Sequence, residues 1–167
     1  MKKRSTLLIL LITSIVFITI FSLTILLRLS NNLTSATLTL LNDNSTVQLS
    51  NNRNNTLINL EVARSEVKQE TGLMYKKEIK QNQGMIFIFS KPSIQKFWMK
   101  DTPTSLDMIF LDQNLNIVQY YQNTIPDSQL PIYSSIGNAQ YVIELKAGWI
   151  HDNLINKSDH FNIHMIN

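Results

Sequence analysis

One uncharged apolar run near the N-terminus constrains this chain more than any other feature. Residues 5–27 contain no charged side chain, and sixteen of the twenty-one residues from Leu7 to Leu27 are apolar, the other five being serine or threonine. At ~1.5 Å per residue a helix of this run reaches roughly 35 Å, more than the ~30 Å of a bilayer core. An isolated strand in lipid would leave its backbone groups without hydrogen bonds, so the run predicts a membrane-spanning helix.

A cleaved signal peptide is the alternative interpretation of this run. Signal peptides have an apolar core of only ~7–15 residues followed by a small-x-small cleavage site. The core here is longer, and the nearest such sequence, Thr34-Ser35-Ala36, lies well beyond it. We therefore expect residues 1–28 to be an uncleaved anchor that contacts the cytoplasmic membrane through residues 7–27.

Charges on the two sides of the run predict its orientation. Lys2, Lys3 and Arg4 precede it, and Arg28 alone follows. The positive-inside bias predicts a single-pass protein whose N-terminus is cytoplasmic and whose C-terminal domain lies outside, in the periplasm or at the cell surface.

The composition of the remaining chain excludes several classes. From residue 29 onward the chain has eleven Lys and Arg and twelve Asp and Glu, so its overall net charge of +3 comes from the N-terminus. We therefore expect no nucleic-acid partner. The chain has no cysteine, which excludes disulfides, thiol nucleophiles and zinc-thiolate sites. No phosphate-binding glycine loop, serine elbow or HExxH motif is present, and we expect no cofactor.

Beyond the anchor, the pattern predicts a polar tether over 29–44 and a compact β domain over 45–167. Residues 29–55 are rich in Asn, Ser and Thr, although alternation at Leu38/Leu40 and Val47/Leu49 allows one or two early strands. Later segments mostly alternate with period two, and Ser65 and Gly72 bracket a short helix. The expected strands are 57–62, 85–89, 96–99, 106–111, 117–121, 141–145 and 160–165, with a second short helix over 147–154 and a long loop over 122–139. Such a pattern predicts a mainly β fold, a sandwich or a partly closed barrel, with one or two short helices.

Five motifs in order resemble the bacterial and archaeal domain-of-unknown-function 192 family over about residues 57–167. They are Gly72-Leu73-Met74, Gly84-Met85-Ile86-Phe87-Ile88-Phe89, Phe97-Trp98-Met99-Lys100, Leu106-Asp107-Met108-Ile109-Phe110 and Tyr141-Val142-Ile143-Glu144-Leu145-Lys146-Ala147-Gly148. The resemblance implies a compact, jelly-roll-like β domain, often exported, and no established activity. The chain departs from the family pattern at Asp101, where asparagine is usual, at Ser105, where proline is usual, and at Lys76, where arginine is typical.

Two carboxylates within apolar strands are the main candidate site residues. Asp107 alternates with apolar neighbours and is expected to be buried, so it either accepts hydrogen bonds from loop backbone N–H groups and fixes the 101–105 turn, or serves as a site carboxylate. Glu144 shares a face with Val142. If their strands are close, Asp107 and Glu144 could act as an acid and base pair; Glu144 could equally pair with Lys100 or Arg64.

The segment around Trp98 predicts a recognition surface. Phe97 and Met99 should face the core, while Trp98 and Lys100 face a groove or rim that Asp101 borders. The alternative is ordinary edge packing of the lysine stem on the indole. His160 and His164 fall on the wet face of a strand, so we expect no metal site there, although a weak one with Asp159 or His151 stays open.

These observations favour a membrane-tethered binding or accessory module. Its groove, lined by Trp98, Lys100, Asp101, Asp107 and Glu144, would bind a small ligand, peptide or envelope component. The alternative function is a hydrolase or lyase that uses Asp107 and Glu144, for instance on glycans. A third interpretation is a purely structural domain of the cell envelope.

Overall fold

The computed structural model describes residues 2–166, except the side chains of 2–10, 31–35, 165 and 166. The chain divides into two compact units, residues 1–36 and 37–167. The first consists of the helix α1 (Lys2–Thr39), whose last turn already belongs to the second unit. The other elements are β1 (Thr46–Asn51), β2 (Leu57–Ala63), α2 (Glu66–Thr71), β3 (Gln83–Ser93), β4 (Lys96–Phe97), β5 (Leu106–Leu111), β6 (Ile117–Tyr121), β7 (Tyr133–Ser134), β8 (Ala139–Lys146), α3 (Trp149–Asp152) and β9 (Phe161–Ile166).

Within α1, Leu11–Ser30 is long and apolar enough to cross a membrane, by length and composition. The hydroxyls of Thr19, Ser22 and Thr24 donate to backbone carbonyls three residues earlier, at 2.8, 3.0 and 2.7 Å. A polar hydroxyl satisfied in this way is compatible with lipid, where an unpaired donor is costly.

The helix continues to Thr39, through most of the segment for which we expected a polar tether. Leu38, which we considered as part of an early strand, lies in its last turn and is fully buried in the core of the β unit. Residues 40–45 form the connection to β1, where Val47 and Leu49 are buried in strand geometry as the alternation predicted.

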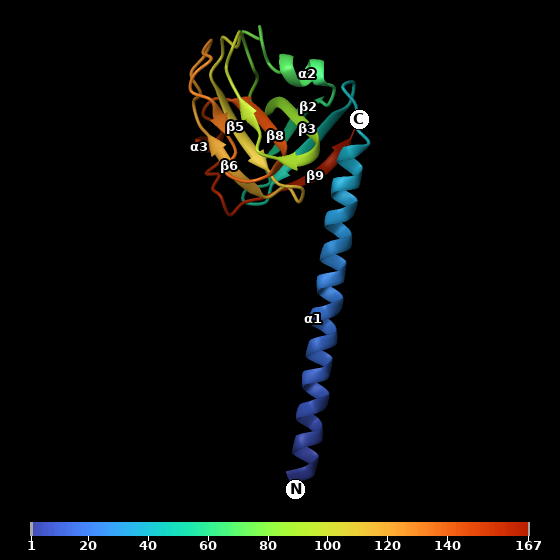
Figure 1. The fold of residues 1–167 in the computed structure, drawn as a ribbon. Helices are drawn as coiled ribbons and strands as arrows, with labels where there is room; N and C mark the ends of the chain where they lie inside the picture. The colour runs from blue at the N-terminus through green and yellow to red at the C-terminus, as the bar shows by residue number, and fades with distance from the viewer. Residues whose placement is uncertain (1, 167) are drawn as a thin grey trace. The chain divides into compact units, whose positions relative to one another are not determined.

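The β unit is a curled seven-stranded sheet in the order β6-β5-β8-β3-β2-β1-β9 (Figure 1). Neighbouring strands are antiparallel except for β2 and β3, which are parallel and joined through α2. An isolated bridge between Asn116 and His160 links the edge strands at one end of the sheet. The mainly β prediction is therefore confirmed, and of the two architectures it allowed the chain forms the partly closed barrel.

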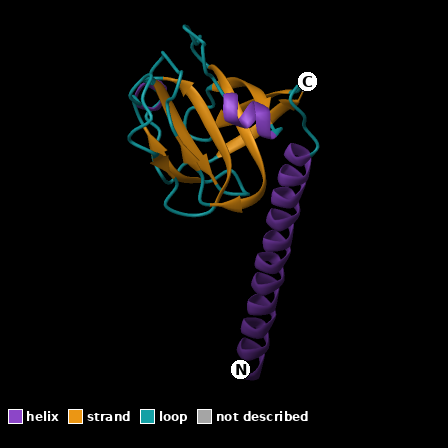
Figure 2. Cartoon of the chain, turned by 45° about the horizontal axis from the view of Figure 1, so that its top comes forward, coloured by secondary structure: helices purple, strands orange, loops and turns teal. Residues whose placement is uncertain are grey.

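Apolar residues fill both faces of the sheet. Ile86, Ile143 and Ile109 belong to a cluster on the concave side, and Phe87, Val142 and Phe110 to a cluster on the other side. Residues from the segments between strands, among them Leu73, Ile79 and Met99, pack on this second, outer face, and the short helix α2 lies beside the sheet (Figure 2). Because both faces of the sheet are covered at its centre, β5 and the 85–89 part of β3 are almost entirely apolar, and β8 is mostly so.

Two expected segments are shorter or more structured than the sequence indicated. The expected strand 96–99 is β4, only two residues long, which pairs with β7 inside the expected loop 122–139. Trp98 and Met99 lie outside the strand, between its end at Phe97 and a turn that begins at Lys100.

Candidate functional site

Glu144 lies on β8, facing the outer side of the sheet. Its cross-strand neighbours are Met85 on β3 and Met108 on β5, both buried. Only 4% of the Glu144 residue is exposed, and its Oε2 has no hydrogen-bond partner among the described residues. Burial without a compensating charge raises the pKa of Glu144 to about 8. The side chain is therefore mostly protonated at neutral pH.

A pocket of about 730 Å³, which we call the Glu144 pocket, has this side chain in its wall. It lies between α2, the 72–75 turn, β3, β4 and the 98–102 segment. This volume is within the range of small-molecule sites. The pocket joins a buried ionisable group to aromatic walls, and such perturbed groups in clefts are candidates for function.

Gly72 forms part of the cover over Glu144. It ends α2 with φ +49° and ψ −128°, a conformation that residues with a Cβ atom rarely adopt and that suits glycine. A Cβ atom here would lie 3.2 Å from Phe87 Cζ and 3.6 Å from Glu144 Oε2. The glycine thus lets the turn pass close to the acid and the phenyl ring.

Aromatic side chains line the pocket, and three of them, all phenylalanines, are in ring contact. The Phe97 ring packs edge-to-face on Phe87 and Phe89, with its centroid 4.9 and 6.4 Å from theirs. It also packs edge-to-face on Phe110, at a centroid distance of 5.8 Å. Trp98 is 45% exposed, and Lys100 Nζ lies 5.6 Å from the centre of its ring. Phe97 and Met99 face the core and Trp98 lies at the rim, as predicted.

Two turns meet at the mouth of the pocket. Tyr75 N donates to the carbonyl of Asp101 at 2.8 Å, and the Tyr75 hydroxyl donates to Asp101 Oδ2 at 3.3 Å. Both residues have positive φ, 63° and 52°. Left-handed backbone in non-glycine residues is uncommon, and asparagine and aspartate tolerate it best. This explains why Asp101 can stand where the family pattern has asparagine.

The structure does not bring Asp107 and Glu144 together. In the β5–β8 ladder Glu144 is opposite Met108, so Asp107, one residue earlier, points to the other face of the sheet. The acid and base pair of the alternative function therefore has no geometric basis. Glu144 also forms no ion pair with Lys100 or Arg64.

Asp107 is a fully buried structural acceptor. Its Oδ1 accepts from the backbone N–H of Asn123 at 2.9 Å, and its Oδ2 from that of Ile150, in α3, at 2.7 Å. It thus accepts backbone hydrogen bonds, as one of our two interpretations held, but it fixes the segments after β6 and β8 rather than the 101–105 turn. At that turn, Ser105 Oγ donates to the carbonyl of Thr124 at 2.7 Å.

Substitution of Asp107 by asparagine tests this role. We expect Asp107→Asn to lower the free energy of unfolding by about 2 kcal/mol, because its amide group would direct a donor at a buried backbone N–H. Urea titration of the full chain in detergent, followed by the fluorescence of buried Trp149, measures the change. Asp127→Asn, at an exposed carboxylate, is the control, with an expected change below about 0.5 kcal/mol. Equal stability of both variants would contradict the role.

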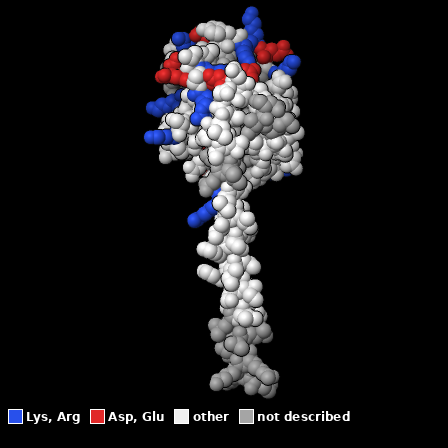
Figure 3. All heavy atoms as spheres, turned by 90° about the vertical axis from the view of Figure 1, so that its right-hand side faces the viewer, with Lys and Arg blue, Asp and Glu red and all other residues white. Residues whose placement is uncertain are grey.

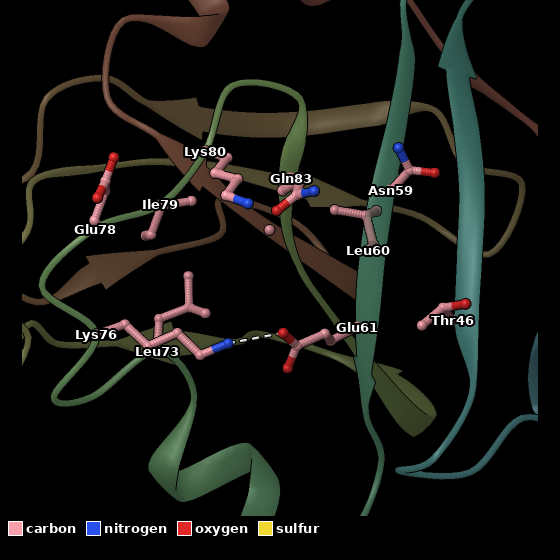
Figure 4. Close-up of a pocket in the computed structure, with 11 residues that line it drawn as sticks. Thr46, Asn59, Leu60, Glu61, Leu73, Lys76, Glu78, Ile79, Lys80 and Gln83 are labelled. Atoms are coloured by element: carbon pink, nitrogen blue, oxygen red, sulfur yellow. Dashed lines mark hydrogen bonds and ion pairs between the residues drawn. The ribbon is translucent and has the colours of Figure 1, made fainter.

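A second pocket, of about 330 Å³, lies between β2, the start of β3 and the 73–80 segment (Figure 4). An exposed ion pair between Lys76 Nζ and Glu61 Oε1, 2.7 Å apart, crosses it. Lys76 therefore has a partner on β2, at the position where the family pattern has arginine. None of the described acids in this pocket is buried, so we take the Glu144 pocket as the candidate site.

The predicted wet face of β9 holds no metal cluster. His164 Nε2 is 2.7 Å from Ser50 Oγ, and Asp159 accepts two hydrogen bonds from Arg53, at 2.8 and 2.9 Å. Among the residues that the structure describes, no group of three or more His, Cys, Asp or Glu side chains could hold a metal ion.

Charged side chains are not segregated by sign on the face shown in Figure 3. Lys and Arg lie among Asp and Glu at one end of the β unit. The Glu144 pocket itself has four acids, Glu66, Glu70, Asp101 and Glu144, and two lysines, Lys96 and Lys100.

Sequence reasoning missed much of this pocket. Tyr75, Phe87 and Phe89 and the two acids of α2 line it, and none of them was a candidate. Gly72 and the phenylalanines do lie within two of the motifs quoted for the resemblance, which was the available signal.

The fold and the pocket define a class of protein, a small curled β domain behind an N-terminal apolar helix. The model of the family called DUF192, described as uncharacterised, matches residues 47–163, and the chain belongs to this family. No curated protein matches the chain.

Two solved structures are similar to this one. A protein of Sinorhizobium meliloti 1021, described only provisionally as a transcription regulator, has a TM-score of 0.67 and 28% identity over 71% of this chain and 92% of its own. A protein of unknown function from Novosphingobium aromaticivorans DSM 12444 has a TM-score of 0.65 and 26% identity over 70% of this chain and 83% of its own.

Proposed function

We propose that this protein is a membrane-anchored binding module that takes a small ligand into the Glu144 pocket. The helix would hold it in the cytoplasmic membrane, and the three cations before the apolar run would keep the N-terminus inside and the β domain outside. The observation that carries the proposal is the unpartnered carboxyl of Glu144, buried in the wall of an aromatic pocket.

A purely structural sheet would gain nothing from an ionisable side chain at position 144. A buried ionisable side chain without partners reduces stability, and an apolar residue beside Met85 and Met108 would avoid this cost. Function commonly explains such a group, because sites retain polar side chains at the expense of stability. The two left-handed residues at the mouth, Tyr75 and Asp101, add backbone strain at the same place.

The hydrolase or lyase interpretation has less support. It required two carboxylates at one site, and Asp107 lies on the opposite face with both oxygens bonded to backbone N–H groups. We therefore retain a binding function.

A fragment screen tests the proposal. We expect saturation-transfer NMR on the full chain in detergent to find fragments that bind, and Trp98→Ala to weaken them at least fivefold by removing an exposed aromatic wall. Ile94→Ala, at an exposed apolar residue outside the pocket, is the matched control and should leave affinity unchanged. If no fragment binds at millimolar concentration, or if Trp98→Ala has no effect on any, the proposed function is wrong.

A further inference from the structure

We propose that the ligand of the Glu144 pocket carries a cationic nitrogen, an ammonium or guanidinium group, that forms an ion pair with Glu144 while an apolar body packs on the aromatic wall. This inference rests on the proposed function and specifies its ligand class. It is carried by the surroundings of Glu144, the charges that line the pocket, and the rings beside it.

The immediate surroundings of Glu144 provide no donor. Met85 and Met108 flank it across the ladder, Gly72 lies over it, and no described side chain donates to its Oε2. A neutral hydroxyl could form a hydrogen bond with the protonated carboxyl group, but it offers no opposite charge to the carboxylate form. A cationic N–H group supplies the hydrogen bond and the charge together, and such charge-assisted bonds are the stronger kind.

The other charged groups of the pocket favour a cation over an anion. Glu66 and Glu70 come from α2, and Asp101 from the turn at the mouth, against Lys96 and Lys100. Lys100 lies over the Trp98 ring rather than in an ion pair with Glu144. Tyr75, the remaining titratable group, contacts Asp101 through its hydroxyl. With Glu144 protonated, the three other acids outnumber the two lysines, so the lining of the free pocket is net negative and attracts a positive ligand.

The rings complete the recognition chemistry. Faces of phenylalanine and tryptophan attract ammonium and guanidinium groups, most strongly where water is displaced. Gly72 lies close to both the Phe87 ring and the Glu144 carboxyl group. A ligand group that reaches Glu144 therefore also comes close to the Phe87 ring. An aromatic wall beside a buried acid is therefore suited to a cation on an apolar body.

Binding of a cation has a consequence for protons. Burial raises the pKa of Glu144 to about 8, so at pH 7 the free pocket holds a carboxylic acid. The ion pair needs the carboxylate, and the proton of Glu144 passes to the buffer as the ammonium binds. Binding at pH 7 should thus release close to one proton, whereas a neutral ligand should release none.

Titration calorimetry on the full chain in detergent tests the inference. The probes are 2-phenylethylammonium, its neutral analogue 2-phenylethanol and the anion phenylacetate, each in phosphate and in Tris buffer at pH 7. We expect the ammonium to bind at least tenfold more tightly than the alcohol. The dependence of its binding enthalpy on the buffer should correspond to release of about 0.9 proton for a group of pKa about 8.

Two variants assign the effect to Glu144. Glu144→Gln should weaken the ammonium at least tenfold, abolish proton release and leave the alcohol within threefold. Glu78→Gln, at an exposed acid in the second pocket, should change neither quantity. Equal affinity for ammonium and alcohol, or ammonium binding without proton release, would overturn the inference while the proposed function stands. Failure of all three probes and of every fragment would overturn both.

Discussion

Replacement of Gly84 by alanine is expected to destabilise the β unit by at least about 3 kcal/mol, the largest effect that we expect from any single methyl group in this chain. Gly84 lies near the start of β3, opposite Leu145 on β8. A Cβ atom at Gly84 would lie 2.0 Å from the backbone carbonyl oxygen of Glu144 and 3.1 Å from its carbonyl carbon. Because the obstacle is backbone in the middle of a sheet, relief requires β3 and β8 to separate.

Urea unfolding of the full chain in detergent, followed by Trp149 fluorescence, measures this effect. Gly137→Ala is the matched control, since its Cβ would meet only the Val118 side chain, at 3.2 Å, and its φ is not positive. We expect the control to change the free energy of unfolding by less than about 1 kcal/mol. Similar values for the two variants would show that β8 does not approach β3 as closely as described.

The stability of the protein is expected to fall by a few kcal/mol as the pH rises from about 4.5 to about 8, because of Glu144 alone. Its pKa is 4.5 in a solvated chain and about 8 in the fold, through burial. Between these values the folded state keeps a proton that the unfolded state releases, so each rise in pH favours unfolding. The contribution is complete below the lower value and lost above the upper one.

Other carboxylates with shifted pKa values affect the stability of the fold over a lower pH range. Hydrogen bonds from Ser65 and Arg64 lower the pKa of Asp43, and Arg53 together with the N–H of Asn156 lowers that of Asp159 despite burial. Their stabilisation is present above the ordinary value of 3.8 and is lost only as the pH falls below it. The decline between pH 5 and 8 is therefore assigned to Glu144.

Unfolding free energies of the wild type and Glu144→Gln at pH 5, 6.5, 8 and 9 test this assignment. We expect the wild type to decline and the variant to change little, so that the variant is the more stable protein at pH 9. Asp127→Asn should follow the wild-type curve. A wild-type profile that is level over this range, or a Glu144→Gln profile with the same slope, would contradict a buried and unpaired Glu144.

Local signals in the sequence were sufficient for most elements of the fold. Ser65 and Gly72 mark the ends of α2 because a serine cap is typically extended, as Ser65 is, and because glycine readily adopts the positive φ found at Gly72. The alternation also separated Phe97 and Met99 from Trp98. Segments that depend on distant partners were missed, as in β7, whose two residues form a strand only because β4 lies beside them.

The relation between Asp107 and Glu144 shows where sequence reasoning ends. Alternation correctly placed each acid on a face with its neighbours, Asp107 with Ile109 and Glu144 with Val142. The alternation could not show whether Asp107 and Glu144 lie on the same face of the sheet. Both faces of β5 and β8 are apolar, so no polar face distinguishes the outside. The register that opposes Met108 to Glu144 is a long-range property.

The bridge between Asn116 and His160 and the pairing of β9 with β1 both depend on a segment that is far along the chain from the first strand. The sheet closes only when β9 has paired with β1, and these strands lie at opposite ends of the domain's sequence. Contacts between such distant segments form late and slow folding. Until β9 has been synthesised, the nascent domain therefore cannot close its sheet, and its hydrophobic core stays open to water. If the domain crosses a membrane during synthesis, it arrives on the far side unfinished and assembles there.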